Sequence, residues 1–520
     1  MGSGREPGSH AVGRRELLAG SLGGGLALVA GGRARATAAP RRGPRYRYAP
    51  SPASLAEHPL PDWWRDAKFG VFVHWGVYSV PAWAPTNWLL NLAEWYWRFQ
   101  SLAGTPYWKH HLETYGANLV YDDFIPHFRA QRYDPAGWAD LFRDAGARYF
   151  ILTTKHHDGF ALFPSAGSRR NAAAMGPRRD LVGPLVSAAR KRDLKVGLYY
   201  SVPEWFNPAP HLQLTLDRVT AGLGGGTDAL VTQAVDAAVF NQGGPSNAYT
   251  LLPVPYRGYR WVADYAHFER AQLRELIRRY HPDEIWADIG GPEDYFRGNE
   301  TIAAFYNQAE THNPDGVVVN DRFGDYRTHH DYVVIENGGS YGLGDYTGGP
   351  SETVRTMGTS WGFNQAEHDY APVETFVREL VNAVANNSNY VLNIGPRADG
   401  TIAEPLVNRL KGIGDWLEIN GEAIYATRTW TRPGAGAVRY TIGKHGRRYV
   451  IALGWPGREL VIDGPAPIPD HAKIVLLGSD GRPLRWRRSG STVRITMPAG
   501  GNLPRATRSR HAFAFRISPD

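Results

Sequence analysis

Cysteine is absent from this chain of 520 residues, which excludes disulfide bonds and thiolate metal sites. A protein without disulfides is stabilised by the size of its core, and a chain of this length can supply a large one. The length suggests two or three domains. After the first 40 residues, no stretch approaches the about 20 consecutive apolar residues that a transmembrane helix needs, so we expect no membrane span.

The sequence also lacks a strong net charge and the motifs of nucleic-acid-binding proteins. The whole chain carries +8, and its first 38 residues hold five Arg and two Glu, which leaves +5 for the rest. Because Lys and Arg look spread along the sequence, we do not expect a nucleic-acid partner. The 17 Trp and 27 Tyr residues instead offer apolar faces with polar tips, which suit the CH faces and hydroxyls of sugars.

The amino terminus has the order of regions that is typical of an export signal. Two arginines at 14–15 precede an apolar run at 22–30 and the small residues Ala36-Thr37-Ala38. We interpret residues 1–38 as a twin-arginine signal peptide, which predicts a secreted or extracytoplasmic protein. A disordered, Arg-rich tail would explain the charge but not this order. Residues 39–58 are rich in Pro, Arg, Ser and Ala and are expected to be a linker.

Several buried strands each deliver polar residues at their carboxyl ends. An α/β fold with parallel strands would bring these ends together, so we predict a TIM-like (β/α)8 barrel, not necessarily a regular one, over residues 59–428. Fewer than eight clear strands are visible, so closure of the barrel is inferred. Four unrelated core strands with polar ends are the alternative. The strands and the residues after them are 69–73 with His74, 149–154 with Lys155 to Phe160, 196–200 with Ser201, and 284–286 with Asp288.

Helical and strand patterns alternate along most of this region, which favours a parallel sheet. We expect helices at 260–280, 299–311, 373–386 and 403–418, and strands at 284–289, 316–320 and 389–395. The pattern fails over residues 207–258, which we interpret as an insertion. Loops of that length are uncommon without a role; the insertion would either shape access to a site or be a solvated excursion without function.

A different pattern begins after Trp430. Short apolar strands separated by Gly, Pro and Asp turns predict an antiparallel β-sandwich over residues 429–520. It contains no group of residues that suggests catalysis. The expected strands are 438–442, 449–453, 459–462, 473–477, 493–496 and 512–517.

Eight motifs in the barrel region together resemble the α-L-fucosidases of glycoside hydrolase family 29. The resemblance implies a retaining exo-hydrolase that releases terminal α-L-fucose from fucosylated glycans, with a catalytic barrel followed by a β-sandwich and with no cofactor or metal. The motifs cover some 360 residues in the same order. They are WRDAKFGVFVHWGVYSVPAW (64–83), EWY (94–96), KHHDGF (155–160), YYS (199–201), PDEIWAD (282–288), SWGFN (360–364), NIGPRADG (393–400) and NGEAIY (420–425).

Retaining glycoside hydrolysis needs an ionised carboxylate nucleophile and a second carboxylic acid roughly 5 Å away. Asp288, fixed to rigid backbone at the end of its strand, is our predicted nucleophile, and the resemblance gives its counterpart that role. The acid/base is open between two residues that we expect on loops after the strand at 316–320. Glu336 ends the stretch DYVVIE (331–336), which resembles a family pattern D-Y-x-T-x-E, and it is favoured. Glu352 matches the Glu of a W-E-T pattern in which Ser351 replaces Trp, and Asp331 is a third candidate.

The resemblance also predicts the residues that bind the sugar. Imidazoles and a carboxylate can bond to vicinal hydroxyls, and aromatic faces can pack on a methyl group. Arg322 is expected to steady Asp288 and lower its pKa. Asp283 and Glu284, at the opposite end of the strand, are expected to be solvated. The predicted sugar-binding residues are His74, Glu94, Trp95, His156, His157, Tyr200, Trp286 and Arg322.

Three other interpretations remain at this point. His74, His156, His157 and Asp158 could hold zinc or manganese in a metal hydrolase, although His156 and His157 would point to opposite sides of an extended strand. The protein could bind fucose or galactose without catalysis. It could also be a hydrolase of branched α-1,3/4 fucosides, or of another sugar of the same configuration. The sequence carries no signal for an oligomeric state.

Overall fold

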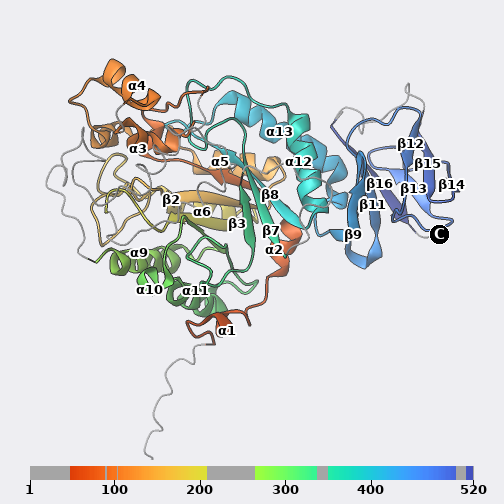
Figure 1. Cartoon of the computed structure of the whole chain (residues 1–520), viewed down its shortest axis with the longest axis horizontal. Helices are drawn as coiled ribbons and strands as arrows, with labels where there is room; N and C mark the ends of the chain where they lie inside the picture. Colours follow the sequence, from red (N-terminus) through yellow and green to blue (C-terminus); the bar gives the residue numbers. More distant parts are fainter. Residues whose placement is uncertain are drawn as a thin grey trace, which may run out of the picture. The chain divides into compact units, whose positions relative to one another are not determined.

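The computed structural model of the chain describes residues 47–87, 91–101, 104–207, 264–336, 349–498 and 511–518. They form a strand-and-helix region followed by antiparallel sheets (Figure 1). The predicted export signal at 1–38 and all of the predicted insertion at 207–258 except Asn207 lie outside the described residues, so both stay predictions. Within the described residues, no helix has the length and apolar character to cross a membrane.

Eight strands of the described chain form one parallel sheet in the order β5-β4-β3-β2-β1-β8-β7-β6. The two edges meet just beyond β5, where Asn320 and Tyr332 form a parallel bridge and the Asp331 N–H donates to the Val319 carbonyl at 3.0 Å. The predicted α/β barrel is therefore confirmed. Its strands are β1 Phe69–Val73, β2 Tyr149–Lys155, β3 Lys195–Ser201, β4 Glu284–Asp288, β5 Val318–Val319, β6 Val333–Glu336, β7 Ser351–Thr356 and β8 Ser388–Ile394.

Two of the helices between the strands, α5 and α9, begin at an Asp that caps them. Asp134 accepts hydrogen bonds from the first N–H groups of α5, and Asp264 does the same for α9, which satisfies donors that have no partner inside a helix. The α-helices are α1 Pro52–Leu55, α2 Asp62–Ala67, α3 Tyr96–Gln100, α4 Pro106–Tyr115, α5 Pro135–Asp144, α6 Val182–Arg190, α9 Tyr265–Tyr280, α10 Glu293–Phe296, α11 Gly298–His312, α12 Val373–Ala385 and α13 Glu404–Asn420. Short 3₁₀ helices are η1 Val77–Ser79, η2 Ala93–Trp95, η3 Tyr121–His127, η5 Gly421–Ala423 and η6 Lys444–Gly446.

The barrel interior is filled mainly by aromatic side chains. Phe72, Tyr149, Tyr199 and Trp286 belong to one buried cluster inside the sheet, whereas the residues that alternate with them pack in the cluster that includes the helices. This is the period-two alternation of strands. The residues two positions beyond three of these side chains therefore lie on the interior side, at the carboxyl ends of the strands. They are His74 after Phe72, Ser201 after Tyr199 and Asp288 after Trp286.

The described part of the predicted linker is packed against the barrel. Tyr48 is buried, its N–H donates to Asn307 on α11 at 3.0 Å, and Arg47 pairs with Glu310 on the same helix. Leu55 on α1 is also buried. Residues 47–58 therefore differ from the expected linker, because a few apolar side chains among the prolines anchor the segment.

The carboxyl-terminal region is an antiparallel sandwich of a five-stranded sheet, β13-β16-β11-β10-β9, and a three-stranded sheet, β12-β15-β14. Its interior has a separate apolar cluster. Hydrogen bonds link it to the barrel: Arg439 donates to Asn382 on α12 at 2.6 Å, and Trp416 on α13 donates to the Ala512 carbonyl at 2.9 Å. The strands are β9 Arg428–Ala435, β10 Val438–Ile442, β11 Arg448–Ala452, β12 Glu459–Ile462, β13 Lys473–Leu476, β14 Trp486–Ser489, β15 Thr492–Thr496 and β16 Phe513–Ser518.

Candidate active site

Asp288 is the last residue of β4 and accepts hydrogen bonds on both carboxylate oxygens. The Tyr199 hydroxyl donates to Oδ2 at 2.8 Å, and Arg322 Nη1 donates to Oδ1 at 3.1 Å. Burial alone would raise the pKa of Asp288, but Arg322, His157 and the Tyr199 hydroxyl outweigh burial and lower it. Asp288 is therefore held as a carboxylate in a largely enclosed position, as a nucleophile requires.

The backbone after Asp288 makes a strained turn that also holds the carboxylate. Ile289 has φ +64°, a left-handed conformation that is unfavourable for a β-branched residue. In this conformation its N–H donates to Asp288 Oδ1 at 2.9 Å. Gly290 follows with φ +59°, and a Cβ there would lie 2.9 Å from the Arg322 carbonyl. The turn thus needs glycine for close approach, and it brings the Arg322 segment against the end of β4.

His157 faces the second oxygen of Asp288. The Ser201 hydroxyl donates to the Pro203 carbonyl, so its 2.5 Å contact with His157 Nδ1 assigns the proton to Nδ1. Burial lowers the pKa of His157 to about 4, and the ring is neutral at pH 7. His157 Nε2, which lies 3.5 Å from Asp288 Oδ2, is therefore an acceptor. A ligand hydroxyl group near both atoms could donate to Nε2 or to Oδ2.

Arg322 connects Asp288 to Glu336. Its second terminal nitrogen donates to Glu336 Oε2 at 2.6 Å, and its guanidinium lies 5.2 Å from the centre of the Trp286 ring. One guanidinium therefore bonds to both carboxylates. The Glu336 side chain is 38% exposed and that of Asp288 13%, so Glu336 is the member of the pair that solvent reaches.

Glu352 lies elsewhere, inside the barrel. It accepts hydrogen bonds from the Tyr149 hydroxyl at 2.7 Å and from Trp286 Nε1 at 2.9 Å, and it is fully buried. Burial and the neighbouring Glu352 raise the pKa of Glu284, which accepts a hydrogen bond from Tyr332. The expectation that Glu284 is solvated is wrong, because its side chain points into the barrel at the start of β4.

The expected loop positions of the two acid/base candidates are also wrong. Glu336 ends β6 and Glu352 is the second residue of β7. Adjacent strands therefore carry the two residues at different depths, since Glu336 pairs in register with Val354 and Glu352 with Val334. This difference of depth puts Glu336 beside Arg322 and Glu352 beneath Trp286.

Three other predicted sugar-binding residues are buried around the same strand ends. The Asn393 amide donates to the Trp361 carbonyl, so its oxygen accepts from His74 Nδ1 at 2.7 Å, and burial lowers the pKa of His74 to about 3. In the described part of the chain, Glu94 Oε1 and His156 Nδ1 are buried without a hydrogen-bond partner. Such orphan polar atoms are costly, and a polyhydroxylated ligand would satisfy them.

Glu94 combines burial with a raised pKa. Burial raises it to about 7, although the Gly362 N–H and the Ser360 hydroxyl, which donate to Oε2 at 2.9 and 3.2 Å, lower it. The group therefore changes charge near neutral pH, and it can donate or accept a hydrogen bond according to its proton.

Aromatic faces line the same region. Trp286 stacks on Tyr199 with ring centres 5.5 Å apart and meets Phe72 edge-on at 5.1 Å. Trp95 lies edge-on to His157 at 5.3 Å. Apolar walls beside a few convergent polar groups are typical of small-ligand sites.

Tyr200, a predicted sugar-binding residue, faces away from this site, whereas its neighbour Tyr199 faces it. The Tyr200 hydroxyl donates to Gln272 on α9 at 2.7 Å, and Lys155 Nζ lies 4.1 Å from its ring centre. Tyr199 pairs in register with Trp286 and bonds to Asp288. The signal was present in the sequence: residues two apart share a face, and Ser201 at the strand end has the parity of Tyr199.

The histidines do not form a metal site in the described residues, where no three His, Cys, Asp or Glu side chains are placed to share an ion. The extended-strand argument does not apply to His156 and His157, because β2 ends at Lys155. Their rings lie 4.2 Å apart. His157 is engaged by Ser201 instead, and Asp158 accepts from the Tyr121 hydroxyl at 2.7 Å.

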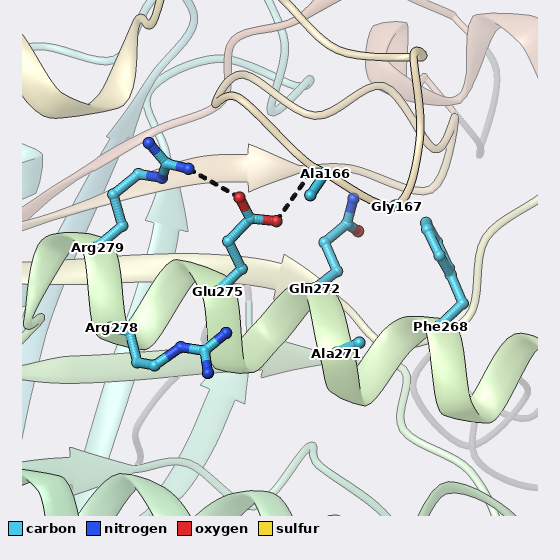
Figure 2. Close-up of a pocket in the computed structure, with 8 residues that line it drawn as sticks. All are labelled: Ala166, Gly167, Phe268, Ala271, Gln272, Glu275, Arg278 and Arg279. Atoms are coloured by element: carbon cyan, nitrogen blue, oxygen red, sulfur yellow. Dashed lines mark hydrogen bonds and ion pairs between the residues drawn. The ribbon is translucent and has the colours of Figure 1, made fainter.

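A cavity of about 540 Å³ lies on the helix side of the sheet, along α9 (Figure 2). Its lining carries one carboxylate, Glu275, which accepts hydrogen bonds from the Ala166 N–H and from Arg279. No second carboxylate faces it among its lining residues. The cavity therefore lacks the pair that hydrolysis needs, and the candidate site remains the strand ends around Asp288.

Comparison with known proteins agrees with this geometry. A family model described as alpha-L-fucosidase matches residues 36–422. Rat tissue alpha-L-fucosidase is 35% identical over 466 residues, covering 87% of this chain and 89% of the relative. Human plasma alpha-L-fucosidase is 33% identical over 459 residues, covering 85% and 86%. Thermotoga maritima alpha-fucosidase, solved with fucose, is 33% identical with a TM-score of 0.72, and the alignment covers 91% of this chain and 100% of that one.

Proposed function

The chain belongs to the α-L-fucosidase family, and we propose that it releases terminal α-L-fucose from fucosylated glycans by double displacement at Asp288. The Asp288 carboxylate attacks the anomeric carbon and bonds to it, while the glycosidic C–O bond breaks and Glu336 gives its proton to the departing oxygen. Glu336 then takes a proton from water, whose oxygen displaces Asp288 and frees fucose. The related T. maritima enzyme has been solved with a mechanism-based inhibitor.

The observation that carries this assignment is the Arg322 bridge between Asp288 and Glu336. Retaining glycosidases keep their two carboxyl groups about 5–5.5 Å apart, and a guanidinium that bonds to both carboxylates holds the two groups near one another. Glu336 is the more exposed of the two, which suits a group that exchanges protons with the leaving oxygen and with water.

We assign Glu352 a positioning role. Its hydrogen bond to Trp286 Nε1 fixes the indole that we place against the sugar, and its burial beneath that ring keeps it from the leaving oxygen. A carboxyl group with two such donors and no solvent contact is suited to orient a neighbour, not to exchange protons with water.

The sugar itself would contact the predicted residues, except that Tyr199 replaces Tyr200. The neutral imidazoles would accept from ring hydroxyls, and Glu94 Oε1 and His156 Nδ1 would gain the partners they lack. The aromatic faces would pack on the methyl group that distinguishes fucose. The residues proposed to bind the sugar are His74, Glu94, Trp95, His156, His157, Tyr199, Trp286 and Arg322.

The deciding experiment compares Glu336→Ala with Glu352→Gln, each assayed on an activated aryl α-L-fucoside with and without azide. Azide attacks the glycosyl-enzyme without general-base help, so Glu336→Ala should regain turnover and form fucosyl azide. Turnover by Glu352→Gln should be slower than that of the wild type and should not change when azide is added. An azide response in Glu352→Gln and none in Glu336→Ala would contradict the assignment.

We also propose export through residues 1–38. Similarity to a plasma fucosidase supports a location outside the cytoplasm, and the sequence order supports the twin-arginine route. Replacing Arg14 and Arg15 by Lys should retain the protein in the cytoplasm of a host that carries that pathway; unchanged export would contradict the route.

A further inference from the structure

Charge is divided sharply between the two regions of the chain. Residues 429–520 contain 16 Lys and Arg but 5 Asp and Glu, a net charge of +11, whereas residues 59–428 contain 33 and 42, a net charge of −9. The expectation that cationic residues are spread evenly is therefore wrong. The basic charge of the sandwich region, next to an acidic barrel region, indicates that the sandwich has an anionic partner.

One face of the sandwich concentrates this charge. In the sheet β12-β15-β14, Leu460, Val493 and Ile495 are buried in the sandwich core, so the residues that alternate with them face outward. These include Arg487 and Arg494, whose side chains are 65% and 42% exposed. Exposed Arg485 precedes β14, and its carbonyl accepts from the Thr496 N–H, so it extends the same row.

The arrangement of these arginines is unfavourable for folding. Arg487 and Arg494 are direct partners across antiparallel strands, and like charges in that relation destabilise a sheet. A single carboxylate, Glu459, lies between them at 3.2 and 3.7 Å. The hydroxyl of Thr492, at the end of the strand that carries Arg494, donates to Asp463 at 2.9 Å. Three guanidinium groups thus face two carboxylates, which leaves a local excess of positive charge.

We propose that the outward face of β12-β15-β14 binds an acidic polysaccharide, a glycan that bears carboxylate or sulfate groups. Arginine pairs bidentately with both groups. Thr492, Thr496 and Ser489 lie among the arginines on the same strands and supply hydroxyls that can bond to sugars. The choice of a glycan among polyanions rests on the proposed function of the barrel.

The face is less suited to the other polyanionic partners. Binding of single-stranded nucleic acid relies on aromatic stacking, and peripheral membrane binding relies on several apolar side chains that insert. On this face the exposed large apolar side chain in the described residues is Val461, at 40%. The net negative charge of the barrel region would also repel the acidic backbone, so that the glycan is held at the sandwich while its neutral fucosyl ends reach the pocket.

The test measures binding of the full chain to dextran sulfate, with neutral dextran, duplex DNA and phosphatidylglycerol vesicles as parallel probes. The triple variant Arg485→Gln, Arg487→Gln, Arg494→Gln should bind dextran sulfate at least about tenfold more weakly at physiological salt, and its salt slope should fall by about 3. The matched control removes the same charge from the barrel through Arg132→Gln, Arg143→Gln and Arg297→Gln, which are exposed, and should bind like the wild type.

A second variant keeps the test informative if the triple variant folds poorly. Glu459→Gln removes the carboxylate shared by Arg487 and Arg494 and should tighten dextran sulfate binding severalfold. Hydrolysis of a small aryl fucoside should be unchanged in every variant, which separates this proposal from the catalytic one. Equal weakening in both triple variants, no binding to dextran sulfate, or tighter binding to DNA or vesicles would overturn the proposal.

Discussion

The barrel and the sandwich use charged side chains in opposite ways. In the barrel, Asp288, Glu94 and Glu352 are enclosed, and neighbouring donors or burial set their pKa values. In the sandwich, arginines stand on an open sheet face with one shared carboxylate. Electrostatic interactions are strong where water is excluded and weak where salt screens them. Charged side chains therefore serve the chemistry of the barrel, whereas those of the sandwich serve salt-dependent binding.

The substitution that we expect to have the largest effect on activity is at Arg322, in the barrel. Arg322→Met removes the group that bonds to both carboxylates, and we expect a loss of kcat/KM of about 10²–10³-fold. The pKa of Asp288, which Arg322 lowers, should rise. Since Asp288 must be ionised to attack, the acid limb of the pH profile of kcat/KM should move to higher pH.

The matched control for Arg322 is Arg355→Met. Arg355 pairs with Glu379 on the outer side of β7, and its loss should leave the pH profile unchanged. An acid limb that stays in place in Arg322→Met would show that Asp288 does not depend on this guanidinium.

An intermediate effect concerns stability and pH. Glu94 has an ordinary pKa of 4.5, and burial raises it in the folded protein to about 7. Between these values the unfolded chain has lost a proton that the folded chain keeps, so the free energy of unfolding falls as pH rises and levels off above 7. This group contributes a fall of about 3 kcal/mol.

Urea unfolding between pH 4.5 and 8 measures that contribution. In Glu94→Gln the fall should be smaller by about 3 kcal/mol, whereas the exposed Glu113→Gln should behave like the wild type. If the free energy of unfolding had the same pH dependence in all three proteins, Glu94 would be ionised in the folded state at low pH. Burial would then not raise its pKa.

The smallest effect lies in the sandwich. Arg494→Thr removes the like-charge partner of Arg487 and places a β-branched residue in β15, so we expect an increase in unfolding free energy of about 0.5 kcal/mol. Denaturant unfolding of the full chain measures it. A loss of more than about 1 kcal/mol would indicate that Arg494 stabilises the sheet and is not retained for binding.

The sequence predicted the parts of the fold that depend on local pattern. Strand β10 matches the expected 438–442, and helices α9, α11, α12 and α13 lie where apolar periodicity indicated them. Strand β6, Val333–Glu336, was missed because its residues were interpreted as part of a loop after the strand at 316–320, and β7 was missed because its Ser-Glu-Thr-Val-Arg-Thr sequence looks polar. Both strands exist through pairing with neighbours that are distant in sequence, which a local pattern does not contain.

The site residues that follow the buried strands were predictable from the sequence. The polar residues that lie inside the barrel were not. The pairing of Arg322 with Asp288 was expected and is present. Glu284 was expected to be solvated at the opening end of its strand, and Glu352 was expected on a loop. Both are buried, and they accept hydrogen bonds from tyrosine and tryptophan side chains of the barrel interior. The distinction between Tyr199 and Tyr200 depends on which face of β3 lines the barrel, and the register with β4 decides it.

The most direct test of the central claim, that Asp288 forms the covalent intermediate, is peptide mapping after reaction with an activated 2-deoxy-2-fluoro-α-L-fucoside. The fluorine slows the second step, so the glycosyl-enzyme accumulates and its mass can be measured. We predict that one fluorofucosyl group is added and that fragmentation places it on Asp288. A label on Glu336 or Glu352, or an unmodified enzyme that still turns over substrate, would contradict the account.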